Sequence, residues 1–189
     1  KTYDMAIARI YKQPLRPYLF DRPIQALQDA LGGLPWLTHI FGRSERLVQY
    51  RDGRQYYTPN VFRERENYIS LLPDNRELGN YAFFVMDEPQ TVTATMGVQN
   101  RLRAPYSLIV WVDMRTIDDN DERNTEAVKE AVLLALQDIH LRRGRFSVTK
   151  IYERAENVWQ GFTQDETQNQ FMMSPFAAFR LVGEMTIYN

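Results

Sequence analysis

The chain contains no cysteine among its 189 residues, and this absence removes several kinds of chemistry at once. Without a thiol there is no disulfide, no thiolate metal site and no cysteine-based redox activity, which suits a reducing cytoplasm. Only two histidines occur, His39 and His140. Neither has a second ligand three or four residues further on, so the helical zinc motifs that depend on this spacing are excluded.

Phosphate-binding and nucleophile motifs are also missing. Gly32 and Gly33 are not followed by the Lys-Ser or Lys-Thr pair of a phosphate loop, and the chain has no Gly-x-Ser-x-Gly sequence. Asp87 and Glu88 are neighbours at the end of a predicted strand, where consecutive side chains point in different directions, so they make a poor acid and base pair. We therefore expect no enzymatic activity and no cofactor.

Long apolar runs and a strong net charge are absent too. No stretch approaches the roughly 20 apolar residues of a membrane-spanning helix, and the first residues do not resemble a secretory leader. A net charge of -1 gives the molecule as a whole no field that attracts nucleic acid or an anionic membrane. We expect no membrane partner.

Lysine is scarce. The 23 basic residues are four lysines and 19 arginines. Guanidinium groups form planar, bidentate and weakly hydrated contacts, so a preference for arginine suits protein interfaces. A biased base composition of the source genome would produce the same preference. The sequence leaves both explanations open.

The composition present is that of a packed protein, with 44% hydrophobic and 13% aromatic residues and only nine glycines. We assign residues 23–189 to a single domain and residues 1–22 to an N-terminal arm. The arm contains Pro14 and Pro17 and at most one short helix, at residues 4–11. It either packs on its own domain or reaches a neighbouring subunit, since its aromatic side chains are too apolar to remain in water.

Two amphipathic segments predict helices. The first runs from Pro23 to Leu31, with Asp21 as its cap and the glycines that follow as its end. The second follows an acidic loop and places an apolar stripe on one side, from residue 128 to residue 139. Asn124 or Thr125 caps its first turn, and we expect it to end at Gly144 after His140 and two arginines.

Alternating or β-branched segments predict the strands. The most apolar is residues 106–114, a central strand covered on both faces. Asp52 and Gly53 predict a tight hairpin turn, because both central residues of a type I′ turn need positive φ. The other predicted strands are residues 46–50, 55–58, 67–72, 80–86, 91–95 and 179–188, with residues 146–162 as one strand or a bent pair. The predicted loops include 96–105 and 163–175. This order of elements indicates an α+β fold, a mostly antiparallel sheet with two main helices packed on it.

Charged side chains gather in three places that suggest an interface. The candidate interface residues are Arg101, Arg103, Asp118, Asp119, Asp121, Arg142, Arg143 and Arg145. The acidic run lacks the glycine and the distant glutamate of a calcium loop, so it favours a solvated loop before the second helix. The last three arginines end that helix, form salt bridges between subunits or line a passage for DNA. Aromatic residues do not alternate with the arginines, so a nucleic-acid groove is not indicated.

Several segments together resemble a known group of proteins. These segments are LPWL at 34–37, FGR at 41–43, YISLLPD at 68–74, GNYAFF at 79–84, DEPQ at 87–90 and RNTE at 123–126. They resemble small structural proteins of the tailed phages and prophages of Bacteroides-like bacteria, and the order of elements is similar to that of phage tail terminator and neck (head-tail connector) proteins.

The resemblance implies a tail-terminator-like virion protein that is present in the host cytoplasm during assembly. It implies a homo-oligomeric ring, commonly sixfold, that ends the tail tube and joins it to the head, with other tail and neck proteins as partners and DNA passing through the lumen. Loops near residues 51–54, 96–104 and 163–175 would face neighbours or the tube. The alternative is a non-enzymatic protein-binding or regulatory module of similar fold.

In such a ring each subunit presents one surface to a different surface of the next subunit. We predict that Arg142, Arg143 and Arg145 meet the acidic loop at residues 118–122 of a neighbour. Reversing these three charges to glutamate should prevent ring formation and leave the monomer folded, as measured by gel filtration and circular dichroism. Unchanged assembly would rule this pairing out.

Overall fold

The computed structural model describes residues 8–64, 67–73, 78–93, 100–117, 124–137, 139, 141 and 144–188. Its strands are β1 (Arg9–Ile10), β2 (His39–Arg51), β3 (Arg54–Glu64), β4 (Asn67–Ser70), β5 (Tyr81–Met86), β6 (Thr91–Thr93), β7 (Arg101–Asp113), β8 (Gly144–Tyr152) and β9 (Phe176–Tyr188). Its helices are α1 (Asp21–Leu31), α2 (Thr125–Gln137), α3 (Ala155–Val158) and α4 (Glu166–Asn169), with 3-10 turns η2 (Met114–Thr116) and η3 (Gln170–Met172).

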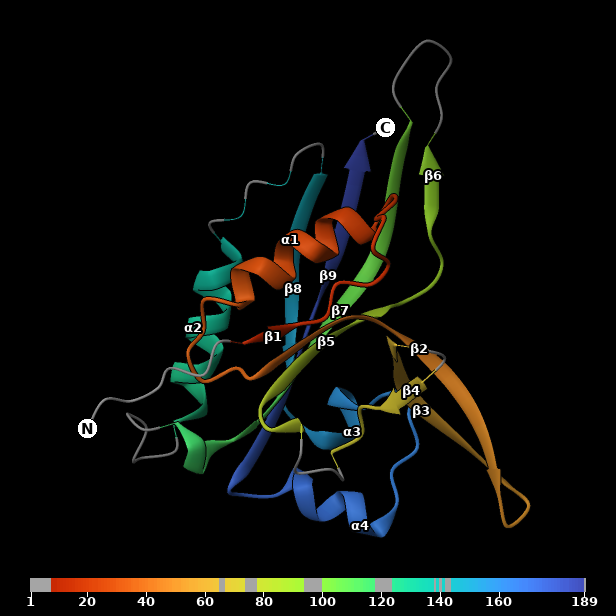
Figure 1. Ribbon diagram of the computed structural model, residues 1–189, viewed down its shortest axis with the longest axis vertical. Helices are drawn as coiled ribbons and strands as arrows, with labels where there is room; N and C mark the ends of the chain where they lie inside the picture. The colour runs from red at the N-terminus through yellow and green to blue at the C-terminus, as the bar shows by residue number, and fades with distance from the viewer. Residues whose placement is uncertain are drawn as a thin grey trace.

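The strands form one sheet in the order β4-β3-β2-β5-β7-β9-β8, with β1 beside β2 and β6 beside β7 (Figure 1). Only the β1–β2 and β2–β5 pairs are parallel, and the other pairs are antiparallel. The first part of β2 belongs to the main sheet, and its second part forms a projecting hairpin with β3. The predicted α+β fold with a mostly antiparallel sheet is confirmed.

The predicted central strand is confirmed as β7, which lies between β5 and β9. It begins earlier than expected, at Arg101, and pairs with β9 along its whole length, from Arg101 opposite Tyr188 to Asp113 opposite Phe176. The predicted loop was therefore wrong over residues 101–105. In this segment Leu102 and Ala104 face the core and alternate with exposed arginines. This is the period of two of a β-strand, and the pairing with β9 forms that strand.

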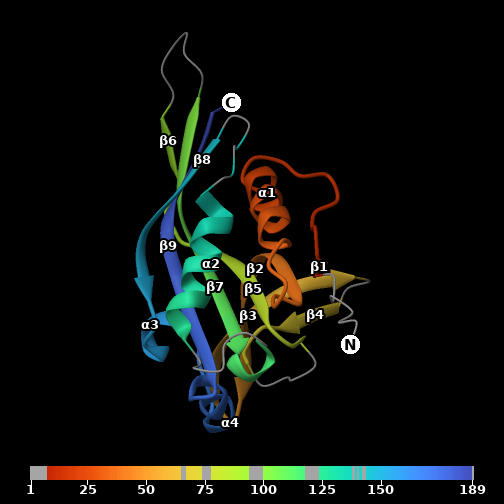
Figure 2. The same cartoon turned by 90° about the vertical axis from the view of Figure 1, so that its left-hand side faces the viewer.

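The two faces of the sheet are covered differently. Helices α1 and α2 pack side by side on one face, which we call the helix face, and share one hydrophobic cluster with Leu108 and Val110 of β7 (Figure 2). The opposite face has a second cluster, built on Ile109 and Trp111 of β7 and covered by β3, β4 and the segment that contains α3 and η3. The prediction of two main helices packed on the sheet is confirmed. No helix among the described residues is long and apolar enough to cross a bilayer.

Asn80 joins three elements at one end of the sheet. Asn80 is buried, with only 2% of its surface exposed. Its Nδ2 donates to the carbonyl oxygen of Trp36 and to Oγ1 of Thr116, both at 2.8 Å, and its Oδ1 accepts from the backbone N–H of Asp113 at 2.8 Å. The starts of β2 and β5 are thereby held against the end of β7.

The described part of the N-terminal arm packs on its own domain. Tyr11 stacks on Phe41 with ring centroids 4.8 Å apart, and the Lys12 ammonium lies 2.7 Å from the Asp29 carboxylate of α1. The predicted helix at residues 4–11 is wrong at its end, because Arg9 and Ile10 form β1 and pair with β2. Residues 1–7 lie outside the described residues.

Both main helices form where expected, with different ends. Asp21 does not cap α1 but lies in its first turn, where its carboxylate accepts from the backbone N–H of Tyr18 at 3.3 Å. Asn124 caps α2, as predicted, through a 3.0 Å bond from the N–H of Glu126. The helix ends at Gln137 and not at Gly144.

The apolar stripe beyond Gln137 misled the prediction of the end of α2. Ile139 and Leu141 are not helical, yet both line the space beside β8. The side chains of Ile139 and Leu141 are therefore partly buried although the helix does not continue to them. His140, Arg142 and Arg143 lie outside the described residues.

The segment after β8 also differs from expectation. The predicted strand or bent pair at 146–162 is wrong beyond Tyr152, because the chain turns into α3 and buries Trp159. The predicted loop at 163–175 contains α4, which begins with a capping box between Asp165 and Gln168. The hairpin turn was predicted correctly, with φ of 50° at Asp52 and 73° at Gly53.

Gly183 controls how β8 lies on β9. A Cβ at this position would lie 1.7 Å from the carbonyl oxygen of Ser147, next to the register shift between Val148 and Lys150. We predict that Gly183→Ala lowers the free energy of unfolding by about 3 kcal/mol, because backbone must move to admit the methyl group. Urea denaturation measures this effect. The control is Gly33→Ala, whose nearest neighbour is 3.4 Å away, and equal stability of both variants would contradict the prediction.

Candidate functional site

On one half of the sheet, no described element covers the face opposite α1 and α2. This half consists of β6, the first part of β7, the last part of β9 and the first part of β8, and it extends beyond α3 and α4 (Figures 1 and 2). We call its uncovered surface the open face. Strand pairing assigns to the open face the side chains of Thr91, Thr93, Arg101, Arg103, Arg145, Ser147, Lys150, Glu184, Thr186 and Tyr188, of which Thr186 is only 4% exposed.

The pairing brings basic residues that are distant in sequence into one row. Thr91 lies opposite Arg103, Arg103 opposite Thr186, and Thr186 opposite Arg145. Directly opposite residues share a face, and neighbouring strands are about 4.8 Å apart, so Arg103 and Arg145 are separated by about 10 Å on the same surface. The row runs across all four strands of this half-sheet.

Positive charge dominates the open face. Arg103 forms an ion pair with Glu184 at 2.7 Å, and the Arg101 guanidinium lies 5.6 Å from the centroid of the Tyr188 ring. Arg145 and Lys150 are exposed and have no acidic partner among the described residues. The face therefore suits a partner that offers hydrogen-bond acceptors or negative charge.

A buried polar network marks the border between the open and the covered halves. Arg180 of β9, with a side chain 6% exposed, lies 2.9 Å from the Asp87 carboxylate and donates to Oγ of Ser107 at 2.8 Å. Ser107 in turn donates to Asp87 at 2.7 Å, and Arg180 also reaches the carbonyl oxygen of Gln160 at 3.1 Å. The network ties β7 and β9 to the segment that leads from β5 to β6.

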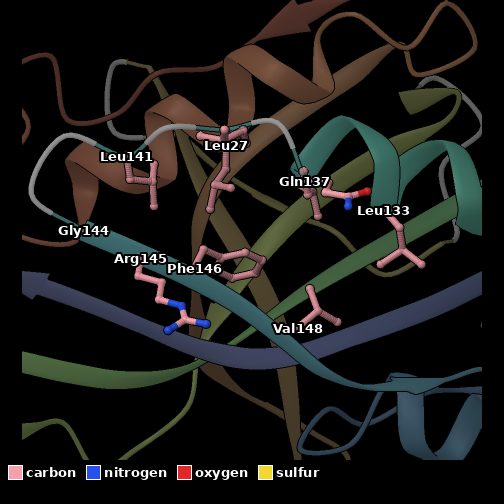
Figure 3. A pocket seen from close by; sticks show the side chains of 10 residues that line it. Leu27, Leu133, Gln137, Leu141, Gly144, Arg145, Phe146 and Val148 are labelled. Atoms are coloured by element: carbon pink, nitrogen blue, oxygen red, sulfur yellow. The ribbon is translucent and has the colours of Figure 1, made fainter.

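An apolar hollow of about 390 Å³ lies on the helix face beside β8 (Figure 3). Leu27 of α1 and Leu133 of α2 form one side, and Phe146 and Val148 of β8 form another. Arg145 borders the hollow, but its pairing with Thr186 places it on the other side of the strand from Phe146. The edge of the sheet thus has an apolar hollow on one side and a basic surface on the other.

A second hollow of about 500 Å³ lies where the arm meets the bend of β2, bordered by Asp21, Arg43 and Glu45 among others. His39 is close to this region and stacks with Tyr11 at 5.9 Å. Burial lowers the pKa of His39, so its imidazole is neutral at pH 7. Within the described part of the chain no three histidine or acidic residues are grouped so that they could hold a metal ion.

The structure brings together three of the eight candidate interface residues. Arg101, Arg103 and Arg145 share the open face, although they come from two separate clusters in the sequence. The other five candidates, Asp118, Asp119, Asp121, Arg142 and Arg143, lie outside the described residues. Lys150 and Glu184 were not among the predicted interface residues, and strand alternation was the only signal in the sequence for them.

Two comparisons with known proteins give no family. No model of a protein family matches the chain, and no curated protein matches its sequence. The resemblance found in the sequence therefore remains a prediction.

We predict that Asp87→Ala lowers the free energy of unfolding by about 2 to 3 kcal/mol, because it leaves the buried Arg180 guanidinium without its counter-ion. The value is at the low end because the Asp87 side chain is 34% exposed. Urea denaturation checks the result, with Glu88→Ala as the control. Glu88 is exposed, so its replacement should change stability by less than about 0.5 kcal/mol. Equal effects of the two variants would contradict the role of the network.

Proposed function

We propose that this chain is a structural protein of a tailed-phage virion, a tail terminator or neck ring subunit that joins the tail tube to the head. It acts by binding copies of itself and other tail and neck proteins, without catalysis. The sequence resemblance suggests this role, and the fold is compatible with it. The subunit would be present in the host cytoplasm during assembly and in the virion afterwards.

The open face is the observation that carries this proposal. Four strands continue beyond the layer that covers the rest of the sheet and present Arg101, Arg103 and Arg145 together. Arg145 also borders the apolar hollow, but the three arginines together lie on a broad surface suited to a macromolecular partner. A polar sheet surface with spare positive charge provides orientation and register in an assembly.

The β2–β3 hairpin supports the same role, because it projects from the body of the subunit (Figure 1). Val48 and Tyr50 are 47% and 70% exposed on it, and Arg46 lies over the Tyr57 ring at 4.0 Å. Apolar and aromatic groups on a projecting element suit contact with a neighbour or with the tail tube. This agrees with the expectation that the loop at residues 51–54 faces a partner.

The charge pairing expected from the sequence also belongs to this proposal. Helix α2 has 13 residues and is therefore about 20 Å long. The acidic loop precedes it and the Arg142–Arg145 cluster follows it. A head-to-tail contact between neighbours would join these two ends, and DNA would pass through the ring.

We predict that the purified chain forms rings with a central hole, seen by negative-stain electron microscopy, and binds isolated tail tubes. Light scattering coupled to gel filtration gives the number of subunits, which we expect to be six. The control is the Arg142, Arg143 and Arg145 charge-reversal variant at the same concentration. A stable monomer that does not bind tubes would contradict the proposal and favour a protein-binding or regulatory module that acts through the open face.

A further inference from the structure

The N-terminal arm is attached to the body of the subunit through one short strand. Among the described strands β1, which has two residues, pairs only with β2. The N–H groups of Arg9 and Tyr11 donate to the carbonyl oxygens of Thr38 and Ile40 at 2.8 and 2.9 Å. After β1 the arm continues as an open loop at the side of the molecule until α1 begins (Figure 2). Side-chain contacts therefore contribute much of what holds the arm in place.

Three aromatic rings, which we call the arm junction, connect the arm to β2. The Tyr11 ring stacks on His39 and on Phe41, with centroids 5.9 and 4.8 Å apart, and the rings of His39 and Phe41 are 6.1 Å apart. All three planes lie within 15° of parallel. The middle residue of the sequence that builds this junction is thus a group that can gain a proton near neutral pH.

Hydrogen bonding assigns the proton on the His39 ring. The Thr38 hydroxyl donates to the carbonyl oxygen of Asn80 at 2.6 Å. Its oxygen then accepts from Nδ1 of His39, which is 3.1 Å away, so Nδ1 carries the hydrogen and Nε2 is the free base. A proton taken up from water adds to Nε2 and gives the ring a positive charge.

Within the described part of the chain, the charged groups that act on this ring are both positive. Burial of the ring is the largest cause that lowers the pKa of His39, and Arg9 of β1 and Arg63 of β3 lower it further. A hydrogen bond with the backbone of Leu78 acts in the opposite direction, and no described carboxylate contributes. The faces of the other two rings attract a cation weakly, which burial and the two guanidinium groups outweigh. The attached arm therefore disfavours a protonated His39.

We propose that His39 is a pH-sensitive switch for the arm, whose protonation releases β1 and Tyr11 from β2. When the arm leaves, Arg9 moves away from the imidazolium and water reaches it, so the released state binds the proton more tightly. Release also opens the hollow of about 500 Å³, because Tyr11, Gln13 and Pro14 form one of its sides. The switch does not depend on the proposed ring.

The direction of the pH response follows from this difference in proton binding. With the arm released, the His39 imidazole titrates near its ordinary pKa of 6.5, and with the arm attached its pKa is lower. The contribution of the junction to attachment is therefore fully present above about pH 6.5 and is lost as the pH falls further. Aspartate remains ionised above about pH 5.5, so the ion pair between Lys12 and Asp29 does not take part in the response.

The absence of native cysteine allows two spin labels to report the position of the arm. Leu15 in the arm is 85% exposed and Leu134 on α2 is 55% exposed, so Leu15→Cys and Leu134→Cys accept nitroxides without disturbing the core. Double electron–electron resonance should give one narrow distance at about pH 7.5. At about pH 5.5 we expect a broad component with at least three times its share at the higher pH. The control pair is Leu134→Cys with Met173→Cys, where Met173 is 68% exposed, and its distance should not change.

Two further variants separate the switch from other effects of pH. His39→Phe keeps an aromatic ring in the junction and cannot be protonated, so the broad component should no longer increase at low pH. This variant also excludes a contribution from His140, the other histidine of the chain. Arg9→Gln removes one exposed positive charge and leaves the three rings in place, so it should reduce the increase.

Three results would overturn the switch. The first is a broad component of equal share at both pH values, and the second is an equal increase in His39→Phe. The third is a control pair that changes together with the first pair, since the whole subunit would then be unfolding. The assembly measurements test the ring separately, so failure of the switch leaves the proposed function in place.

Discussion

The antiparallel pairing of β7 with β9 is the interaction on which the rest of the structure depends. It joins thirteen residue pairs, and it spans 63 residues of chain at Asp113 and Phe176 and 87 at Arg101 and Tyr188. Both helices pack on these two strands, and both edges of the uncovered half-sheet are built outward from them. Because the surface on which the helices pack is held together by this pairing, β9 is needed for the whole fold.

Local patterns were sufficient to predict most elements of this fold. The apolar run in β7, the Asp52–Gly53 turn and the Asn124 cap each encode their structure within a few residues, because backbone geometry and side-chain periodicity act locally there. The errors occur where tertiary contacts decide. Residues 101–105 contain too few apolar groups to predict a strand, and pairing with β9 makes them one. Ile139 and Leu141 continue a helical stripe, yet they are not part of the helix.

The candidate site was predictable in its residues but not in its arrangement. The arginine clusters were recognised from the sequence, whereas their common surface depends on register. A shift of one residue in β8 would turn Arg145 to the helix face and Phe146 to the open face. The close approach of Gly183 to Ser147 and the adjacent register shift belong to the pairing that fixes this choice. No single segment of the sequence contains that information.

The two sides of the half-sheet suit different kinds of contact. The open face carries arginines and a lysine, and removing these from water would be costly without matched acceptors, so a dry contact there is unfavourable. Apolar groups at the same edge lie on the helix face, beside Phe146 and Val148. An incoming side chain can be buried there without removing a charged group from water. A contact that buries the helix side of this edge therefore leaves the basic side hydrated, so the two sides can serve different contacts at the same time.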